Sequence, residues 1–213
     1  MGTVVVMGLI DRLKSSPKIA GPIGYYGLSE WWLATFTEAE RKYIGLASNS
    51  PTGGGPLTEG HISYSSGTAA QFLSALATNF YKPPDQRIAR LMLSKAEELA
   101  KAAGNVLDLH FVYAGMIKTF YADRDNDPQA LDFAIVACEE QIALAPKAAE
   151  AWKREYPGEL LPGHTGYTQL AIIREKQKHF ADAITLSRLA LGQGWAGDWE
   201  HRIARNEKRL ISS

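Results

Sequence analysis

Hydrophobic and polar residues alternate with a helical period along most of the chain after Ser66. Apolar residues recur three or four positions apart, which places them on one face of an α-helix. The pattern predicts eight helices, at about 67–81, 85–103, 106–122, 128–145, 148–155, 164–178, 180–192 and 198–211. We therefore expect an all-α fold in which these helices pack on one another.

Several predicted boundaries carry residues typical of helix ends. Pro84-Asp85 and Asp127-Pro128 indicate helix starts, because proline in the first turn loses no intrahelical hydrogen bond. Gly104 and Gly192 indicate helix ends, since glycine readily adopts the left-handed conformation that follows a last turn.

The first 66 residues lack a sustained period, and we expect an irregular, aromatic-rich segment packed against the helical domain. Residues 9–13 are predicted as a short helix, and 21–27, with its glycines and proline, as a loop. Ser29 is predicted to cap a short helix that carries two tryptophans. Thr37 and Glu40 have the spacing of a capping box, which predicts a further helix start.

Residues 49–66 form a long polar connection that contains Gly53-Gly54-Gly55. Loops of this length are uncommon and are either mobile or functional. Ile62 and Tyr64 alternate with polar residues, which predicts a short strand-like piece. The glycines lack the Gly-Lys-Ser/Thr ending of a phosphate-binding loop, so a flexible linker is the simpler interpretation.

Small residues recur with the same two steps, of 12 and then 7 residues, in two distant parts of the chain. They are Ala77, Ala89 and Ala96 in the first part, and Ala171, Ala183 and Ala190 in the second. A weaker middle copy contains Gly115, Ile117 and Tyr121 in its first helix, and Ala134 and Cys138 in its second. Because alanine or glycine lets two helices approach closely, the spacing predicts antiparallel helical hairpins that stack to bury their apolar faces.

These residues resemble the tetratricopeptide repeat (TPR) family. Leu170-Ala171 is similar to the family's Leu-Gly pair, Tyr167 and Phe180 to its aromatic positions, and Pro146 to its closing proline. The last unit departs from the family after its second helix, where Trp195 replaces the expected proline. In its first helix, Arg174 stands at the usual tyrosine position.

The repeat step also differs from the family. Ala89 to Ala134 is 45 residues and Ala134 to Ala183 is 49, against 34 in a TPR. The resemblance covers about 67–211, and implies a helical domain at 67–213 that ends in a capping helix. Asp198 is predicted to cap that last helix, and a basic docking face on the helix is the alternative interpretation.

In TPR proteins the ligand usually lies along the first helices of successive hairpins. The resemblance therefore implies that Thr168, Ile172, Glu175 and Lys176 face a partner-binding groove. The alternative is a solvated helix face.

The N-terminal segment contains a dense group of aromatic residues. Tyr25, Tyr26, Trp31 and Trp32 supply large apolar area, so core packing is the simplest interpretation. If they are exposed together, they would mark a partner-binding patch.

Composition narrows the possible functions. With 46% hydrophobic and 22% charged residues among 213, the chain falls in the globular range. Lys plus Arg and Asp plus Glu both number 23, so the chain lacks the basic surplus of a nucleic-acid-binding protein. The apolar run at 4–10 is too short to span a bilayer and has no basic n-region, so we expect a cytoplasmic protein without a membrane partner.

No candidate metal, cofactor or catalytic motif has the required spacing. The acidic run from Asp123 to Asp127 lacks the glycine and glutamate of a calcium loop and is interpreted as an inter-helix turn. The single cysteine, Cys138, is interpreted as a small buried hydrophobe. The five histidines do not show ligand spacing: His61, His110, His164, His179 and His201. His164 precedes a predicted helix, where a local capping role is the favoured interpretation.

The leading hypothesis is a non-enzymatic adaptor or interaction module that binds a peptide or protein partner. One alternative is an enzyme or small-ligand-binding protein whose site lies between the 49–66 loop and the helices and uses Glu59 and His61. Another is a structural subunit that associates with itself.

Overall fold

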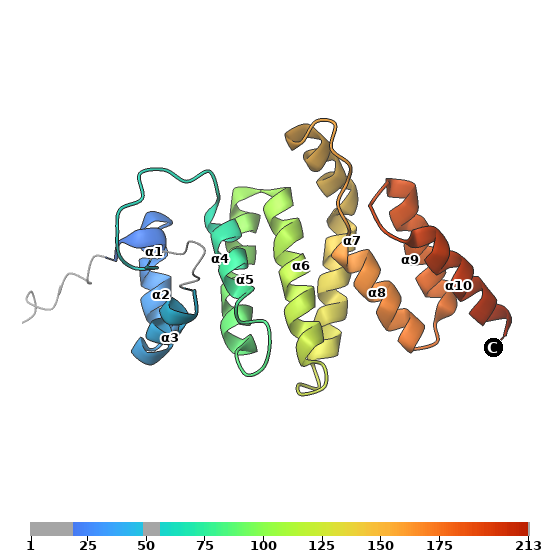
Figure 1. Cartoon of the computed structure of the whole chain (residues 1–213), viewed down its shortest axis with the longest axis horizontal. Helices are drawn as coiled ribbons and strands as arrows, with labels where there is room; N and C mark the ends of the chain where they lie inside the picture. The colour runs from blue at the N-terminus through green and yellow to red at the C-terminus, as the bar shows by residue number, and fades with distance from the viewer. Residues whose placement is uncertain (1–18, 49–55, 213) are drawn as a thin grey trace, which may run out of the picture. The chain divides into compact units, whose positions relative to one another are not determined.

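The computed structural model describes residues 19–48 and 56–212, and all of its regular elements are helices (Figure 1). The contacts divide the chain into two compact units, with the boundary in the sequence between Ser66 and Gly67, and each unit is described by itself. The helix predicted at 9–13 and the glycine run at 53–55 lie outside the described residues. How the first unit packs on the second stays a prediction.

The described part of the first unit is more regular than the sequence indicates. It contains α1 (Gly21–Tyr25), α2 (Ser29–Thr35) and α3 (Glu38–Ser48). Apolar side chains of the three helices, of the positions that flank α2 and of the following segment form its core: Ile23, Leu28, Trp32, Phe36, Ile44 and Leu57. The short helices predicted after Ser29 and after Thr37 are confirmed as α2 and α3, whereas the prediction of irregular structure is wrong for α1.

Helix α1 replaces most of the loop predicted at 21–27. Pro22 lies in its first turn, where a missing N–H costs nothing, so proline starts the helix rather than interrupting it. The Gly21 N–H donates to the Gly60 carbonyl at 2.9 Å, and Gly21 has a φ of +58°. A Cβ at Gly21 would lie 2.6 Å from the Glu59 carbonyl oxygen, so this close approach requires glycine.

The cap predictions for this unit have different outcomes. Ser29 is the first residue of α2 and not its cap, because Leu28 holds that position without a side-chain bond. The capping box at Thr37 and Glu40 is confirmed: the Glu40 N–H donates to the Thr37 hydroxyl at 3.3 Å, and the Thr37 N–H to the Glu40 carboxylate at 2.8 Å. The stretch around Ile62 and Tyr64 forms no strand, so that prediction is wrong.

The second unit consists of seven helices that lie side by side in sequence order and run alternately up and down (Figure 1). They are α4 (Ala69–Ala77), α5 (Gln86–Ala103), α6 (Val106–Asp123), α7 (Ala130–Glu155), α8 (Thr165–Lys176), α9 (Phe180–Gln193) and α10 (Trp199–Ile211). Each packs on the next helix of the chain, and α6 also contacts α4 and α8. The predicted all-α fold class is confirmed for the described residues.

The small residues identified in the sequence lie at the helix contacts. All are buried, with at most 2% of their surface exposed: Ala77, Ala89, Ala96, Ala134, Cys138, Ala171, Ala183 and Ala190. A larger side chain at these positions would separate the helix axes.

Helix α7 differs most from the prediction, because one helix replaces the two predicted at 128–145 and 148–155. Pro146 lies inside it and does not close a unit, so its assignment as a closing proline is wrong. Proline removes one intrahelical hydrogen bond. The alanines on both sides, Ala145, Ala148 and Ala149, are buried in one cluster with Tyr167, so packing continues across the proline.

The helix ends agree with the sequence in part. Gly104 follows α5 in the left-handed conformation, with φ 63°, as predicted. The left-handed residue that follows α9 is Gly194, whereas Gly192, the predicted end, lies inside the helix. Asp127 precedes α7 by three residues, and its carboxylate accepts from the Gln129 N–H at 3.0 Å.

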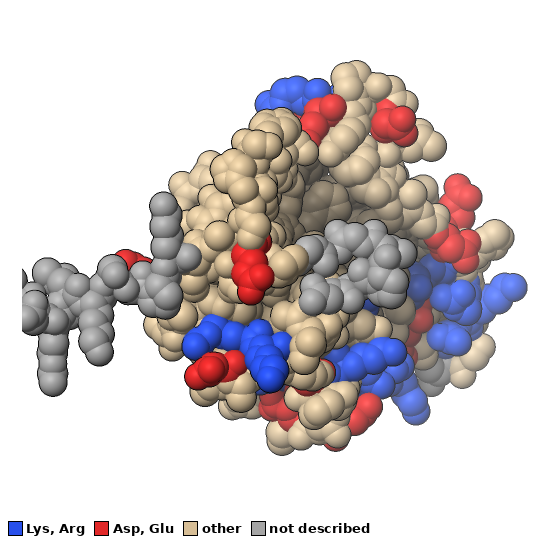
Figure 2. All heavy atoms as spheres, turned by 60° about the vertical axis from the view of Figure 1, so that its left-hand side comes forward, with Lys and Arg blue, Asp and Glu red and all other residues tan. Residues whose placement is uncertain are grey.

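The last helix, α10, packs on α9, and its first residue, Trp199, is buried. Asp198 holds the cap position but makes no capping bond to the helix backbone, so the predicted cap is wrong in its hydrogen bond. The Trp199 indole N–H donates to the Trp195 carbonyl at 2.7 Å and fixes the turn before the helix. In the view of Figure 2, acidic and basic side chains are interspersed, as the balanced composition leads one to expect.

Candidate functional site

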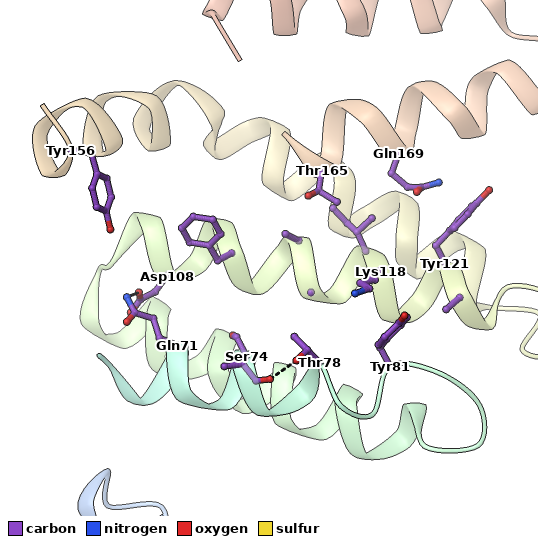
Figure 3. Close-up of a pocket in the computed structure, with 16 residues that line it drawn as sticks. Gln71, Ser74, Thr78, Tyr81, Asp108, Lys118, Tyr121, Tyr156, Thr165 and Gln169 are labelled. Carbon is purple, nitrogen blue, oxygen red and sulfur yellow. Dashed lines mark hydrogen bonds between the residues drawn. The ribbon is translucent and has the colours of Figure 1, made fainter. Parts of the chain in front are cut away.

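A groove of about 840 Å³ runs across α4, α6 and α8 in the second unit (Figure 3). Helix α6 lies between the other two and contacts both. The lining residues recur at three- and four-residue steps on each helix, so each helix contributes one face. The volume falls in the range typical of ligand-binding sites.

The floor of the groove is one face of α6. Phe111, Ala114, Gly115 and Lys118 line it in order along the helix. Ala114 and Gly115 leave the middle of the floor hollow. A Cβ at Gly115 would lie 2.8 Å from the Leu93 side chain, so glycine also permits α6 to approach α5.

Each of the two walls contains one buried polar group without a partner. Ser74 lies on α4, and Gln169 lies on α8 across the groove. The Ser74 hydroxyl and the Gln169 side-chain nitrogen are buried and make no hydrogen bond within the structure. Buried polar groups are usually hydrogen-bonded, so these two are candidates for bonding to a ligand.

One end of the groove is built around Asp108, which is only 2% exposed. Its carboxylate accepts from the Thr68 hydroxyl at 2.6 Å and from the Gln71 amide at 2.7 Å. Thr68 and Gln71 also form the capping box of α4. The Asp108 N–H donates to the side chain of Asn105, the cap of α6, at 3.1 Å, so Asp108 joins the starts of both helices.

Two aromatic side chains complete this end. Phe111 and Tyr156 line the groove, and Figure 3 shows the Tyr156 ring directed toward Asp108 and Gln71. The Tyr156 hydroxyl donates to the Glu155 carboxylate at 3.1 Å, and this bond raises the pKa of Tyr156. The Asp108 end therefore combines aromatic surface with the Asp108 carboxylate, and Glu155 contacts it through the Tyr156 hydroxyl.

The opposite end carries two lysines and two tyrosines. The Lys118 ammonium lies 4.0 Å from the centre of the Tyr81 ring. The Lys176 ammonium donates to the Tyr121 hydroxyl at 2.8 Å. Lys118, Tyr81 and Tyr121 line the groove, and Lys176 reaches it through Tyr121.

The structure places the four α8 residues implied by the TPR resemblance in different surroundings. Lys176 lies at the lysine end of the groove, while Thr168 and Ile172 are half-buried on α8. The Glu175 carboxylate accepts from Arg202 and Asn206 of α10, both at 2.8 Å, and so contacts the last helix.

Sequence reasoning missed most of the groove residues. On α8 the lining residues are Thr165 and Gln169, four residues apart. On α6, Asp108, Phe111, Gly115 and Lys118 follow the same three- and four-residue steps. A helical-wheel comparison of the predicted first helices could have found these faces, but not that they enclose one groove.

The four aromatic residues of the first unit do not share one environment. Trp32 is buried in the core, and its ring centre lies 5.1 Å from that of Phe36. Trp31 is half-buried, while Tyr25 is 41% exposed. Tyr26 bonds through its hydroxyl to Ser65 at 2.7 Å.

A buried polar cluster joins α6, α7 and α8 beneath the groove. Gln141 donates to the His110 carbonyl at 2.8 Å and accepts from the Gly166 N–H at 2.6 Å. The His164 ring accepts from the Tyr167 N–H at 3.2 Å, so the predicted capping role of His164 is confirmed. Burial lowers the pKa of His110 to about 4 and, together with the neighbouring His110, that of His164 to about 3.

The cysteine and the acidic residues considered as candidates have environments typical of structural residues. Cys138 is buried, and desolvation raises the pKa of its thiol to about 12, as expected for a buried hydrophobe. Asp123 and Asp127 pair with Arg90 at 2.6 and 2.8 Å. Within residues 19–48 and 56–212, no cluster of three or more His, Cys, Asp or Glu side chains is arranged to hold a metal ion.

The groove side chains supply hydrogen bonds, charge and aromatic surface, and neither His nor Cys is among its lining residues. No helix in the described ranges is long and apolar enough to cross a membrane. Comparison with protein-family models, curated proteins and solved structures found no match for this chain. Its function is therefore inferred from the groove itself.

Proposed function

We propose that this protein is a non-enzymatic adaptor whose TPR-like helical hairpins hold an extended segment of a partner protein. The observation that carries the proposal is the groove on α4, α6 and α8, which are the first helices of the three proposed hairpins. Three parallel faces of alternate helices form a long concave surface, as stacked helical repeats do.

The contacts between helices support this arrangement. Helix α4 packs on α5, α6 on α7 and α8 on α9, with the small residues of the repeat buried between them. The additional contacts of α6 with α4 and α8 bring the first helices into one row. This interpretation tolerates the irregular repeat step, because the extra residues of the second step lie in the extension of α7 and in the segment before α8, and the first step spans the long helices α5 and α6.

An extended polypeptide suits the groove walls. Its backbone alternates donors and acceptors, and rotation of the Ser74 and Gln169 side chains would bring their buried, unpartnered groups to it from opposite walls. The apolar floor at Ala114 and Gly115 accepts small side chains. The groove thus offers main-chain bonds for affinity and separate pockets for specificity.

Filling the groove tests the proposal. Ala75 is exposed and lines the groove, so Ala75→Trp blocks it without disturbing the core, whereas Ala143→Trp adds the same bulk to an exposed position of α7. We expect affinity capture from native cell extract to recover one partner with the wild-type protein and with Ala143→Trp. Ala75→Trp should reduce its recovery at least about tenfold.

Equal recovery by both tryptophan variants would contradict a role of the groove. Repeated failure to recover any partner with the wild-type protein would contradict the adaptor function itself. Circular dichroism of both variants checks that the helices are intact.

The alternatives stay hypotheses. Glu59 and His61 of the enzyme alternative are exposed in the first unit. Self-association is tested separately by measuring the mass of the full chain in solution.

A further inference from the structure

The carboxylate of Asp108 is buried at one end of the groove without a cationic partner. Its hydrogen bonds come from Thr68 and Gln71, which are neutral, and no Lys, Arg or His of the described ranges forms an ion pair with it. The start of α6 offers only about half a positive charge. A buried carboxylate is normally paired, so a cation supplied by the ligand would complete this site.

The neighbouring side chains suit such a cation. Phe111 lines the groove one turn after Asp108 on α6, and the Tyr156 ring is directed toward Asp108 (Figure 3); cations bind favourably over such rings. The hydroxyl of Tyr156 is held by the Glu155 carboxylate, which adds negative charge. A guanidinium fits best, because its planar shape both stacks on rings and bonds to carboxylates.

The opposite end of the groove has the opposite charge. Neither Lys118 nor Lys176 forms an ion pair with any carboxylate in the part of the chain that the structure describes; each lies against a tyrosine instead. Together with the hydroxyls of Tyr81 and Tyr121, the two ammonium groups provide donors for a carboxylate.

The two ends are joined by one helix, which fixes their separation. Asp108 and Lys118 are ten residues apart on α6, which corresponds to about 15 Å along the helix axis. An extended chain advances about 3.3 Å per residue, so about four to five residues bridge this length.

We propose that the groove recognises a partner segment with a basic residue, preferably arginine, at the Asp108 end and an acidic residue four or five positions away at the Lys118 end. The inference deepens the proposed function, because it names the chemistry of the segment that the groove holds. It assigns the basic residue to the start of α6 and the acidic residue to the part of α6 near Lys118, and the two peptide sequences below determine the N-to-C direction.

Short peptides in the two possible directions test this charge pattern. The probes are acetyl-Arg-Ala-Ala-Ala-Glu-amide, its reversed sequence acetyl-Glu-Ala-Ala-Ala-Arg-amide, and a neutral peptide with glutamine at both ends. Each is titrated into the ¹⁵N-labelled full chain, and binding is followed by NMR chemical shifts. We expect one charged peptide to bind at least about tenfold more tightly than the neutral one, with shifts at α4, α6 and α8.

Charge-removing variants assign each end. With the tighter-binding peptide, replacing only its arginine by glutamine should weaken binding to the wild-type protein but not to Asp108→Asn, and replacing only its glutamate by glutamine should weaken binding to the wild-type protein but not to Lys118→Gln. Asp182→Asn and Lys147→Gln remove the same charges from exposed positions of α9 and α7 and should change neither preference. Because Asp108 also joins two helix starts, the peptide substitutions in the wild-type protein keep the test valid if Asp108→Asn does not fold.

Two results would overturn the inference. One is equal affinity for charged and neutral peptides, which would mean that the groove does not distinguish peptides by their charge. The other is the absence of groove shifts with every peptide up to millimolar concentration. The adaptor function is judged separately, by the effect of Ala75→Trp on recovery of the native partner.

Discussion

At the residue scale, His110 and His164 show how polar side chains are held inside this helical protein. Their ring centres lie 5.0 Å apart, and the indole ring of Trp195 stacks on His110 at 5.3 Å. The pKa values of about 4 and 3 mean that both rings are neutral in the folded protein at neutral pH. Protonation would place charge in a cluster whose other members are aromatic rings and the amide of Gln141.

This pair predicts a loss of stability in mild acid. The folded pKa values lie below the value of about 6.5 in the unfolded chain, so the unfolded state binds more protons as the pH falls below 6.5. The contribution of the two neutral histidines to the free energy of unfolding should therefore be complete above pH 6.5. Between pH 6 and 4 each histidine should lower it by about 1.4 kcal/mol per pH unit.

Urea unfolding between pH 7 and 4.5 measures this slope. His164→Asn keeps a capping oxygen but removes one titrating ring, and should reduce the slope by about one proton. His201→Asn, at an exposed position, is the control. An unchanged slope in His164→Asn would show that the buried pair is not its source.

At the scale of elements, Glu175 attaches the last helix to α8. Its carboxylate accepts from Arg202 and Asn206 at 2.8 Å and lies 3.4 Å from Arg205. Burial alone would raise the pKa of Glu175, but the bond from Asn206 and the charges of both arginines outweigh it and lower the pKa. The attachment should therefore be lost as the pH falls through the lowered pKa of Glu175.

Glu175→Gln should loosen α10 without unfolding the unit. The variant leaves Arg202 without its charged partner, and we expect a cost of about 1–3 kcal/mol at neutral pH. Hydrogen exchange of the α10 amides should become faster, while that of α6 should not change. Glu139→Gln removes the exposed partner of Arg174 and serves as the control; if it has the same effect, Glu175 has no special role.

The sequence predicted the elements better than the site. Helical periodicity located all seven helices of the second unit to within a few residues, except that Pro146 divided α7 in the prediction. Residue spacing cannot show that buried alanines on both sides of Pro146 hold one continuous helix. Helix α1 was missed for a similar reason. Gly21 and Pro22 are typical of turns, and only the tertiary hydrogen bonds of this stretch show that it forms a helix.

At the scale of the whole molecule, the described helices form two units, and the proposed binding surface belongs to the second. The groove combines faces of α4, α6 and α8, whose residues lie far apart in the sequence. Periodicity predicts each face separately, but their common groove depends on how the hairpins stack. Asp108 and Lys118 can bind one segment together only because the stacked hairpins form a single groove around them.

The central claim, that a partner segment lies in this groove, is tested most directly by photo-crosslinking in the native cell. A benzophenone amino acid replaces either Ala75, inside the groove, or Ala143, on the exposed face of α7. We predict a covalent adduct with one partner protein from position 75 and none from position 143. Adducts from position 143 alone would contradict the account and place the partner on the other face of the helices.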